Sequence, residues 1–287
     1  MNKLLNQLLL FGFFIGSIKA MQIKPLHKII SDLQRFGLRP LDIFFRLTNG
    51  SSKYPKLLIN SIPKAGTHLL ERAIILHRSF YRKLLPTLTE ENIKNYGGLE
   101  SVSKKLTNSQ IILAHLTYSK LKEKIIIEND IKCIFTIRDP RDILVSDAYH
   151  LGRQKKHRLY HLFKTLTINE RINLLLRGDD KNNLMPFAEF INQFLGWLNS
   201  KAYVVKFEDL VINSHKRETT INNIYEFLGI ILKKKEKNHI LDNLISSASP
   251  TYRAGGQDRW SNYFSKDSLY EMSPSMTDVI ENLGYKI

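Results

Sequence analysis

The fold is decided by residues 56–70, which read KLLINSIPKAGTHLL. An apolar run leads into a turn with proline and glycine, and an amphipathic stretch then extends from Thr67 to about Phe80. This order of strand, tight loop and helix predicts a βα unit. The N–H groups at a helix start point outward and favour negative charge, and Lys64 adds a cation. The loop is therefore a candidate anion site; the alternative is a plain turn capped by Thr67.

The same pattern recurs along the chain. Further apolar runs lie at residues 110–114, 132–137 and 202–206, and helical patterns lie at 139–149 and 214–228. Continuous apolar strands separated by helices are typical of parallel strands that are buried on both faces. The chain is therefore predicted to be an α/β protein, a three-layer sandwich with a central parallel sheet.

Composition narrows the range of partners. The 287 residues suit one domain with or without an appendage, and 43% hydrophobic with 24% charged residues argue against a disordered or fibrous protein. A net charge of +16 favours a polyanion, an acidic membrane surface or a phosphorylated small molecule. The single cysteine, Cys133, excludes an intrachain disulfide and a zinc site built from several cysteines. We expect it to be a buried strand residue.

The N-terminus differs from the rest of the chain. Residues 4–18 are mostly apolar, and as a helix they would span about 22 Å, less than the ~30 Å hydrocarbon core of a bilayer. The segment between Lys3 and Lys19 resembles a signal peptide or anchor, with a retained packing helix as the alternative. We expect residues 1–50 to be an appendage and residues 51–287 to form the main domain. A cytoplasmic protein is expected, and a membrane-anchored or secretory-pathway protein is the alternative.

Candidate ligand-binding residues lie where predicted strands end. In an open parallel sheet, ligands bind beyond the carboxyl ends of the strands. Arg138 ends one strand, Asp139 and Pro140 suit the start of the next helix, and Ser146 lies eight residues after Arg138. Arg138 and Ser146 could share an anion, or the arginine could lie on the surface beside a capped helix. His115 ends another strand and is a candidate general base or a structural histidine.

A further basic segment lies near the C-terminus. Residues 252–264 hold a Gly-Gly pair between Arg253 and Arg259, with aromatic residues around it. The segment could close over a phosphate and exclude water. The alternative is a turn pinned by Trp260.

Together these motifs resemble those of the sulfotransferases that use 3′-phosphoadenosine 5′-phosphosulfate (PAPS). Residues 63–67, PKAGT, are similar to the family's phosphosulfate loop P-K-[SA]-G-T, and Arg138 with Ser146 is similar to its 3′-phosphate motif. Residues 207–210, FEDL, resemble its [YF]-E-D-L segment, and residues 253–260 match the length of its loop R-K-G-x-x-G-D-W. His115 stands where the cytosolic branch has its catalytic histidine. The resemblance implies a P-loop-nucleotide-kinase-like fold.

The resemblance also implies a site and a reaction. The residues implied to hold the cofactor are Lys64, Ala65, Gly66, Thr67, His68, Arg138, Ser146, Phe207, Arg253, Ala254 and Gly255. His115 would take a proton from an acceptor hydroxyl or amine as it attacks sulfur in line. Lys64 would neutralise charge on the bridging oxygen as 3′-phosphoadenosine 5′-phosphate (PAP) leaves. No metal is required.

Some positions depart from the family pattern. Leu69 stands where the family commonly has a tryptophan that stacks on adenine, and Phe207 stands where it usually has a tyrosine. Ala254 replaces the second basic residue of the C-terminal loop, and Leu113 replaces a lysine of the cytosolic branch. His68 is a second candidate base, although its place in the first helical turn suits phosphate contact better.

The partners follow from the same resemblance. The expected acceptor is a small molecule or a glycan, framed by residues 77–108 and 150–200, and no nucleic-acid partner is expected. Membrane association would run through residues 4–18, and the sequence leaves the oligomeric state open. One alternative function is a nucleotide-dependent phosphotransferase, which is disfavoured because phosphate loops of that class place glycine before lysine, whereas Gly66 follows Lys64. The other alternative is a basic protein that binds nucleic acid or membranes.

Overall fold

The structure is a computed structural model, and it describes residues 54–77, 79–83, 85–245, 259–264, 268, 272 and 274–287. The predictions for residues 1–50 and for Arg253, Ala254 and Gly255 fall outside the described residues. The appendage, its membrane association and the cytoplasmic location therefore stay predictions. Among the described residues, no helix is both long and apolar enough to cross a membrane.

A parallel sheet forms the centre of the fold. Its strands are β1 (Lys56–Ser61), β2 (Tyr81–Arg82), β3 (Leu88–Thr89), β4 (Gln110–His115), β5 (Ile131–Ile137) and β6 (Tyr203–Lys206). Their order is β2-β4-β1-β5-β6, and β3 pairs with β4 farther along the same edge. Every strand pairing in the described residues is parallel, and Ile59 of β1 lies between Leu113 and Ile134.

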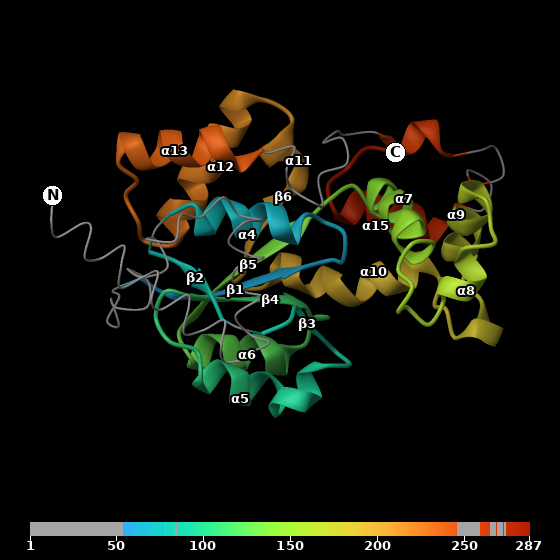
Figure 1. Ribbon diagram of the computed structural model, residues 1–287, viewed down its shortest axis with the longest axis horizontal. Coiled ribbons are helices and arrows are strands. Elements are labelled where there is room, and N and C mark those ends of the chain that lie inside the picture. Colours follow the sequence, from blue (N-terminus) through green and yellow to red (C-terminus); the bar gives the residue numbers. More distant parts are fainter. Residues whose placement is uncertain are drawn as a thin grey trace, which may run out of the picture.

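Helices cover both faces of the sheet (Figure 1). One face carries α4 (Thr67–Ile75), α11 (Phe207–Val211), α12 (Ser214–Phe227) and α13 (Lys234–Leu244). The other face carries α5 (Gly98–Lys104) and α6 (Lys120–Glu128). The remaining helices gather mainly at one end of the molecule: α7 (Pro140–Leu151), α8 (Tyr160–Phe163), α9 (Ile168–Arg177), α10 (Phe187–Leu195) and α15 (Pro274–Asn282). Short 3₁₀ helices are η1 (Ile93–Tyr96), η2 (Asp180–Asn182), η3 (Gly196–Asn199) and η4 (Arg259–Asn262).

Two hydrophobic cores explain why the strands read as continuous apolar runs. Leu57 and Ile59 are fully buried in the cluster that contains α4 and α12, whereas Leu58 is fully buried in the cluster on the opposite face. Successive side chains of a strand point to opposite faces, so both sets must be apolar when both faces are covered. Cys133 is buried in β5, as predicted, and this burial raises the pKa of its thiol.

The predicted fold class is confirmed, with corrections at its edges. The four predicted strands correspond to β1, β4, β5 and β6, and Asp139 caps α7 with Pro140 in its first turn. The helix expected from Thr67 to about Phe80 ends at Ile75, which is a wrong end point. The edge pieces β2 and β3 were not expected, because two-residue strands carry no readable alternation of apolar and polar side chains.

Candidate functional site

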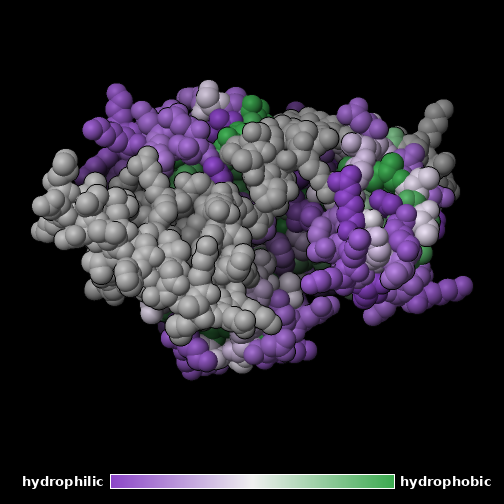
Figure 2. Space-filling model, viewed as in Figure 1, coloured by the Kyte–Doolittle hydropathy of each residue, from purple (hydrophilic) through white to green (hydrophobic). Residues whose placement is uncertain are grey.

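The carboxyl ends of β1 and β5 define the candidate site. These strands are neighbours, yet the chain leaves β1 toward β2 on one side of the sheet and leaves β5 toward β6 on the other. Ligands bind at such a switch point in open α/β sheets, because the diverging connections leave a crevice there. A cavity of about 1220 Å³ lies at these strand ends. In the space-filling view a recess with hydrophilic walls opens beside the α8–α9 end of the molecule (Figure 2).

The structure brings most of the predicted site residues to this one cavity. Those that line it are Lys64, Gly66, Thr67, His68, His115, Arg138, Ser146 and Phe207. Ala65 is the one predicted site residue among those described that does not line the cavity. Its side chain is fully buried in the core, so only its backbone could contact a ligand. Residues from both segments expected to frame an acceptor, 77–108 and 150–200, also line the cavity.

The loop after β1 is held in a conformation that needs glycine. Lys64 and Gly66 have positive φ angles of 67° and 93°, and the Ala65 N–H donates to the Ile62 carbonyl at 3.1 Å. A Cβ on Gly66 would lie 2.3 Å from the ring of Phe207, so Phe207 packs directly on the glycine backbone. A side chain at this position would suffer both strain and a clash.

Thr67 faces the strand end and does not cap the helix. The N-cap of α4 is Gly66, which makes no side-chain capping bond, so the capping alternative for Thr67 is wrong. The Thr67 hydroxyl lies 2.6 Å from the hydroxyl of Ser61, which in turn lies 3.1 Å from Nδ1 of His115. The first N–H groups of a helix have no intrahelical partner. The start of α4 therefore presents N–H donors to the cavity wall.

His115 is held as a neutral imidazole. Its Nδ1 lies 3.0 Å from the carbonyl oxygen of Ser61, which can only accept, so Nδ1 carries the proton and Nε2 keeps a lone pair. Burial lowers the pKa of His115 to about 4; the Ser61 carbonyl opposes this effect, and the charges of His68 and Lys64 add to it. The arrangement suits a group that accepts a proton at Nε2.

Arg138 carries a donor that lacks a partner. Its guanidinium stacks on the Phe207 ring at 4.4 Å, and its Nη2 lies 3.3 Å from a carboxylate oxygen of Asp142. Its Nε is buried and finds no hydrogen-bond partner among the described residues. A buried donor without a partner is costly, and an anionic oxygen would satisfy it. Ser146 lies on α7 and lines the same cavity, as the eight-residue spacing predicted.

Glu208 joins the two strand ends that carry Arg138 and Phe207. One of its carboxylate oxygens accepts the Asp139 N–H at 3.0 Å, and the other accepts the Tyr285 hydroxyl at 2.7 Å. Burial raises the pKa of Glu208, although both hydrogen bonds oppose this rise. The buried carboxylate of Glu208 thus connects the start of α7 with the start of α11. The glutamate of the FEDL segment therefore has a structural role in holding these two helices together.

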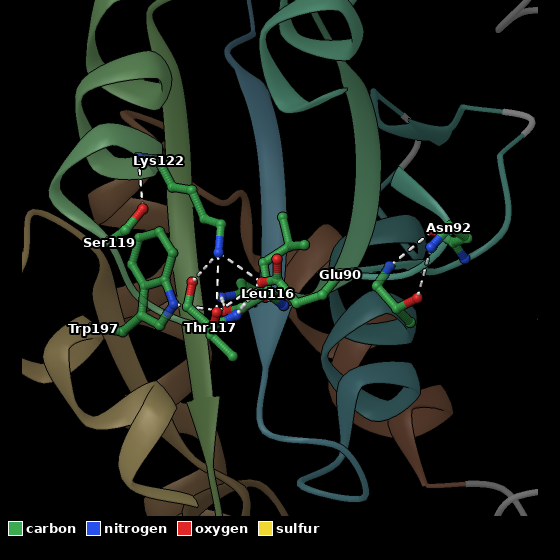
Figure 3. Close-up of polar contacts among 9 residues, drawn as sticks. Glu90, Asn92, Leu116, Thr117, Ser119, Lys122 and Trp197 are labelled. Atoms are coloured by element: carbon green, nitrogen blue, oxygen red, sulfur yellow. Dashed lines mark hydrogen bonds and ion pairs between the residues drawn. The ribbon is translucent and has the colours of Figure 1, made fainter. Parts of the chain in front are cut away.

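The segment after His115 is fixed by the side chains of Asn60, Trp197, Glu90 and Lys122 (Figure 3). The backbone of Leu116 exchanges two hydrogen bonds of 2.9 Å with the Asn60 side chain, and its carbonyl also accepts Trp197 Nε1 at 2.8 Å. Glu90 accepts both the N–H and the hydroxyl of Thr117, at 2.9 and 2.8 Å. Lys122 closes the group with a 2.6 Å ion pair to Glu90. These contacts hold the end of β4 in place.

Sequence reasoning missed several acidic residues of the cavity, and Asp147 lies next to a predicted site residue. Asp147 follows Ser146 and lines the cavity wall. Burial raises the pKa of Asp147 to about 6, and the charge of Lys64 opposes this rise. The neighbouring wall is apolar, with Val145, Tyr149, Leu159, Phe187, Phe190 and Phe194. The cavity therefore combines a charged end at the strand tips with an apolar end between the helices.

The described part of the C-terminal basic segment packs against α7. Arg141 stacks on the Trp260 ring at 4.1 Å, and the Trp260 N–H donates to Asp142 at 3.0 Å. Asp142 thus contacts both Trp260 and Arg138, so this part of the chain is linked to the cavity wall. Among the residues that the structure describes, no cluster of three His, Cys, Asp or Glu side chains could hold a metal ion.

Comparison with known proteins gives one consistent result. A family model described as the sulfotransferase domain matches residues 54–274. The 3-alpha-hydroxysteroid sulfotransferase of Cavia porcellus is 27% identical over 192 residues, which cover 62% of this chain and 60% of the relative. Sulfotransferase 2A6 of Rattus norvegicus is 26% identical over 196 residues, which cover 66% and 64%. The chain thus spans about three fifths of the length of these relatives.

Solved structures share the fold. Mouse sulfotransferase SULT7A1 complexed with PAP gives a TM-score of 0.59 at 18% identity, covering 85% of this chain and 90% of that one. Retinol dehydratase in complex with androsterone and the inactive cofactor PAP gives 0.56 at 15% identity, covering 86% and 87%. At these identities the likeness establishes the architecture, including the predicted central parallel sheet between helix layers.

Proposed function

The chain belongs to the sulfotransferase domain family, and from this premise we propose that it transfers a sulfuryl group from PAPS to a hydroxyl or amine of a small-molecule acceptor. The observation that carries the proposal is that one cavity wall holds Lys64, His115 and Arg138. The PAP held by the solved relatives supports a 3′-phosphoadenosine nucleotide as the ligand.

The residues present fit such a nucleotide. The positive φ of Lys64 and the bare Gly66 leave the loop backbone open to an anion, and the N-terminus of α4 favours negative charge. We assign the 5′-phosphosulfate to Lys64, Thr67 and the loop backbone from Ala65 to His68. We assign the 3′-phosphate to Arg138, whose Nε lacks a partner among the described residues, and to Ser146.

The adenine and the last phosphate contacts complete the proposed site. Phe207 lines the cavity, and we propose that the purine packs against the part of its ring that Arg138 leaves uncovered. Arg253, Ala254 and Gly255 are proposed to close over the 3′-phosphate, as the family loop implies. Leu69 also lines the cavity and offers an apolar surface where the family commonly has tryptophan.

The chain's own groups are proposed to carry the transfer. Nε2 of His115 accepts the proton of the acceptor hydroxyl while the acceptor oxygen forms its bond to sulfur. The bond between sulfur and the 5′-phosphate oxygen breaks, its electron pair stays on that oxygen, and the ammonium of Lys64 neutralises the charge. Such positioning and fixed charge are the main sources of rate enhancement in group transfers of this kind.

The acceptor is proposed to be a small molecule with an apolar body. The cavity end formed by Val145, Phe187, Phe190 and Phe194 suits an apolar skeleton, and His115 lines the same cavity. The relative named as a hydroxysteroid sulfotransferase supports this class of acceptor. Polar groups such as His150, Arg153 and Gln193 also line the cavity and can hold polar substituents of the acceptor.

Binding of PAP, measured by isothermal titration calorimetry, tests the proposal. We expect the wild type to bind PAP and Arg138→Ala to bind it about 30-fold or more weakly, because hydrogen bonds to charged groups contribute about 1.5–3 kcal/mol each. Arg177→Ala is the matched control, since Arg177 is exposed on α9 and does not line the cavity. Equal affinity of Arg138→Ala and wild type would contradict the assignment of the 3′-phosphate.

Turnover separates the proposed function from its alternatives. Labelled PAPS and labelled ATP are offered in parallel with a panel of phenols and hydroxysteroids. We expect label transfer from PAPS alone. Transfer from ATP would establish the phosphotransferase, and salt-dependent retention on DNA without PAP binding would establish the basic binding protein.

A further inference from the structure

A buried carboxylate lies directly behind the phosphosulfate loop. Glu71 is on the second turn of α4 and is completely buried. One of its oxygens lies 2.9 Å from Nδ1 of His68, and the other accepts a hydrogen bond from Nη1 of Arg82 at 3.2 Å. Arg82 is fixed in turn by a hydrogen bond from Nη2 to the Leu85 carbonyl at 3.2 Å. The cluster of His68, Glu71 and Arg82 thus connects the start of α4, next to the phosphosulfate loop, to the edge strand β2.

The charges of this cluster determine the state of His68. A buried carboxylate is tolerated only when it is paired, and Arg82 supplies a permanent positive charge. The second carboxylate oxygen still needs a donor, and Nδ1–H of His68 provides it. Nδ1 therefore carries a proton, and Nε2 is the nitrogen that remains for a ligand. The His68 side chain is 33% exposed and lines the cavity beside Lys64.

The surroundings also allow His68 to carry a second proton. The charged and titratable groups near His68 are Glu71 and Lys64 on its own segment, Arg82 on β2 and His115 on β4. Glu71 compensates Arg82 when His68 is neutral. An anion placed against Lys64 would add negative charge on the cavity side, so that a proton on Nε2 of His68 would lie between two negative groups.

We propose that Glu71 is a positioning residue that holds His68 with Nδ1–H toward the protein core, and that His68 takes one proton from solvent onto Nε2 and donates it as a hydrogen bond to a non-bridging oxygen of the bound phosphosulfate. The inference rests on the proposed function. No bond of the ligand is made or broken in this step. It gives the loop a cation that forms when the ligand binds, in addition to the permanent charge of Lys64.

Proton uptake measured by calorimetry tests the proposal. PAP is titrated at pH 8 in two buffers of different ionisation enthalpy, because the difference in heat counts the protons taken up. We expect the wild type to take up a proton on binding, and His68→Asn to lose this uptake and to bind PAP about 10-fold more weakly. His161→Asn is the matched control, since His161 is exposed on α8 and does not line the cavity.

A second variant isolates the part played by Glu71. Glu71→Gln keeps the size of the side chain and a group able to accept a hydrogen bond, but removes the negative charge. The ring nitrogens of His68, followed by ¹⁵N NMR, should show one N–H at Nδ1 in free wild type and two N–H groups in the PAP complex. Glu71→Gln should lose the second N–H in the complex.

The outcomes are distinguishable from failure of the proposed function. If wild type does not bind PAP, the proposed function fails. If wild type binds PAP with equal proton uptake in His68→Asn, or if Glu71→Gln keeps the doubly protonated ring, the inference about His68 and Glu71 is overturned while the proposed function stands.

Discussion

The two histidines of the cavity wall occupy opposite electrostatic surroundings. His115, at the end of β4, meets the carbonyl and the hydroxyl of Ser61, which are both neutral. His68, in the first turn of α4, meets the buried carboxylate of Glu71. The Ser61 carbonyl favours the charged form of the His115 ring, but burial outweighs it, whereas the partner of His68 carries a full negative charge. The same residue type thus has neutral hydrogen-bond partners in one place and a carboxylate partner in the other.

The difference has a chemical consequence for a sulfuryl transfer. A base must be unprotonated before the acceptor arrives, and burial keeps His115 in that state. A group that binds an anion gains from a positive charge, and Glu71 makes such a charge tolerable on His68. The comparison therefore predicts that losing either histidine damages a different step.

The largest effect is expected from His115→Ala. Removal of a general base typically costs about 10²–10⁴-fold in rate, so kcat should fall by about 10³-fold while the Kd for PAP changes by less than about three-fold. Steady-state kinetics and calorimetry measure the two quantities. His161→Ala serves as the control for an exposed histidine. Turnover within ten-fold of wild type would show that His115 is not the base and would break the comparison.

The next effect is a pH dependence of stability. The pKa of His115 is about 4 in the folded protein, and an unfolded histidine has a pKa of about 6.5. Between these values the unfolded chain binds more protons, so the free energy of unfolding falls as the pH drops through this window. Urea denaturation should show that His115→Gln loses about 1–2 kcal/mol less than wild type between pH 7 and pH 5. Equal losses in both proteins would show that His115 is not buried as a neutral ring.

Ser61→Ala sharpens the comparison by removing one of the two neutral partners. The Ser61 hydroxyl is fully buried and bridges Thr67 and His115, while the Ser61 carbonyl still holds Nδ1 after the substitution. We expect a loss of about 1–2 kcal/mol in unfolding free energy and a several-fold lower kcat. Ser119→Ala is the matched control. It removes the N-cap of α6, which should lower the unfolding free energy by a similar amount, about 1 kcal/mol, without removing a contact of His115. A kcat equal to that of the control would remove the Ser61 hydroxyl from the proposed mechanism.

The fold could be predicted because its signals are local. The continuous apolar strands and the cap formed by Asp139 and Pro140 follow from burial on both faces and from backbone hydrogen bonding. The end of α4 at Ile75 could not be predicted from the sequence, because the apolar residues after it pack in the core without being helical. Phe80, for example, is fully buried outside any helix. A buried apolar residue looks the same in the sequence whether it lies in a helix or in the loop that follows it.

The candidate site was predicted where its residues are close in sequence. The PKAGT loop and the spacing from Arg138 to Ser146 bring side chains to one cavity wall because each lies on a single strand–helix unit. Glu71 was missed, and Glu208 was identified only as part of the FEDL segment, because Arg82 of β2 pairs with Glu71 and an N–H that is 69 residues away in the chain meets Glu208. The role of a buried carboxylate cannot be predicted until the residues that it contacts are known.

The smallest effect is expected from Glu90→Gln, which separates position from charge. Glu90 is a carboxylate that lines the cavity, and its hydrogen bonds and ion pair go to Thr117 and Lys122 and not to a histidine ring. Burial raises the pKa of Glu90, but hydrogen bonds from Lys122 and Thr117 outweigh this and lower it. Because the ion pair is partly exposed, its loss should cost less than about 1 kcal/mol and lower kcat by about two-fold.

The pH profile of Glu90→Gln decides what its carboxylate does. If contact with the ring is what sets the charge of a histidine, kcat/KM should keep the pH dependence of wild type in Glu90→Gln, whereas Glu71→Gln should change the pH dependence of PAP binding. Glu100→Gln, which removes an exposed ion pair with Lys104, is the control for loss of a surface carboxylate. A shifted kcat/KM profile in Glu90→Gln alone would mean that a carboxylate can act on His115 through the backbone of Thr117, and the two histidines would then differ in degree and not in kind.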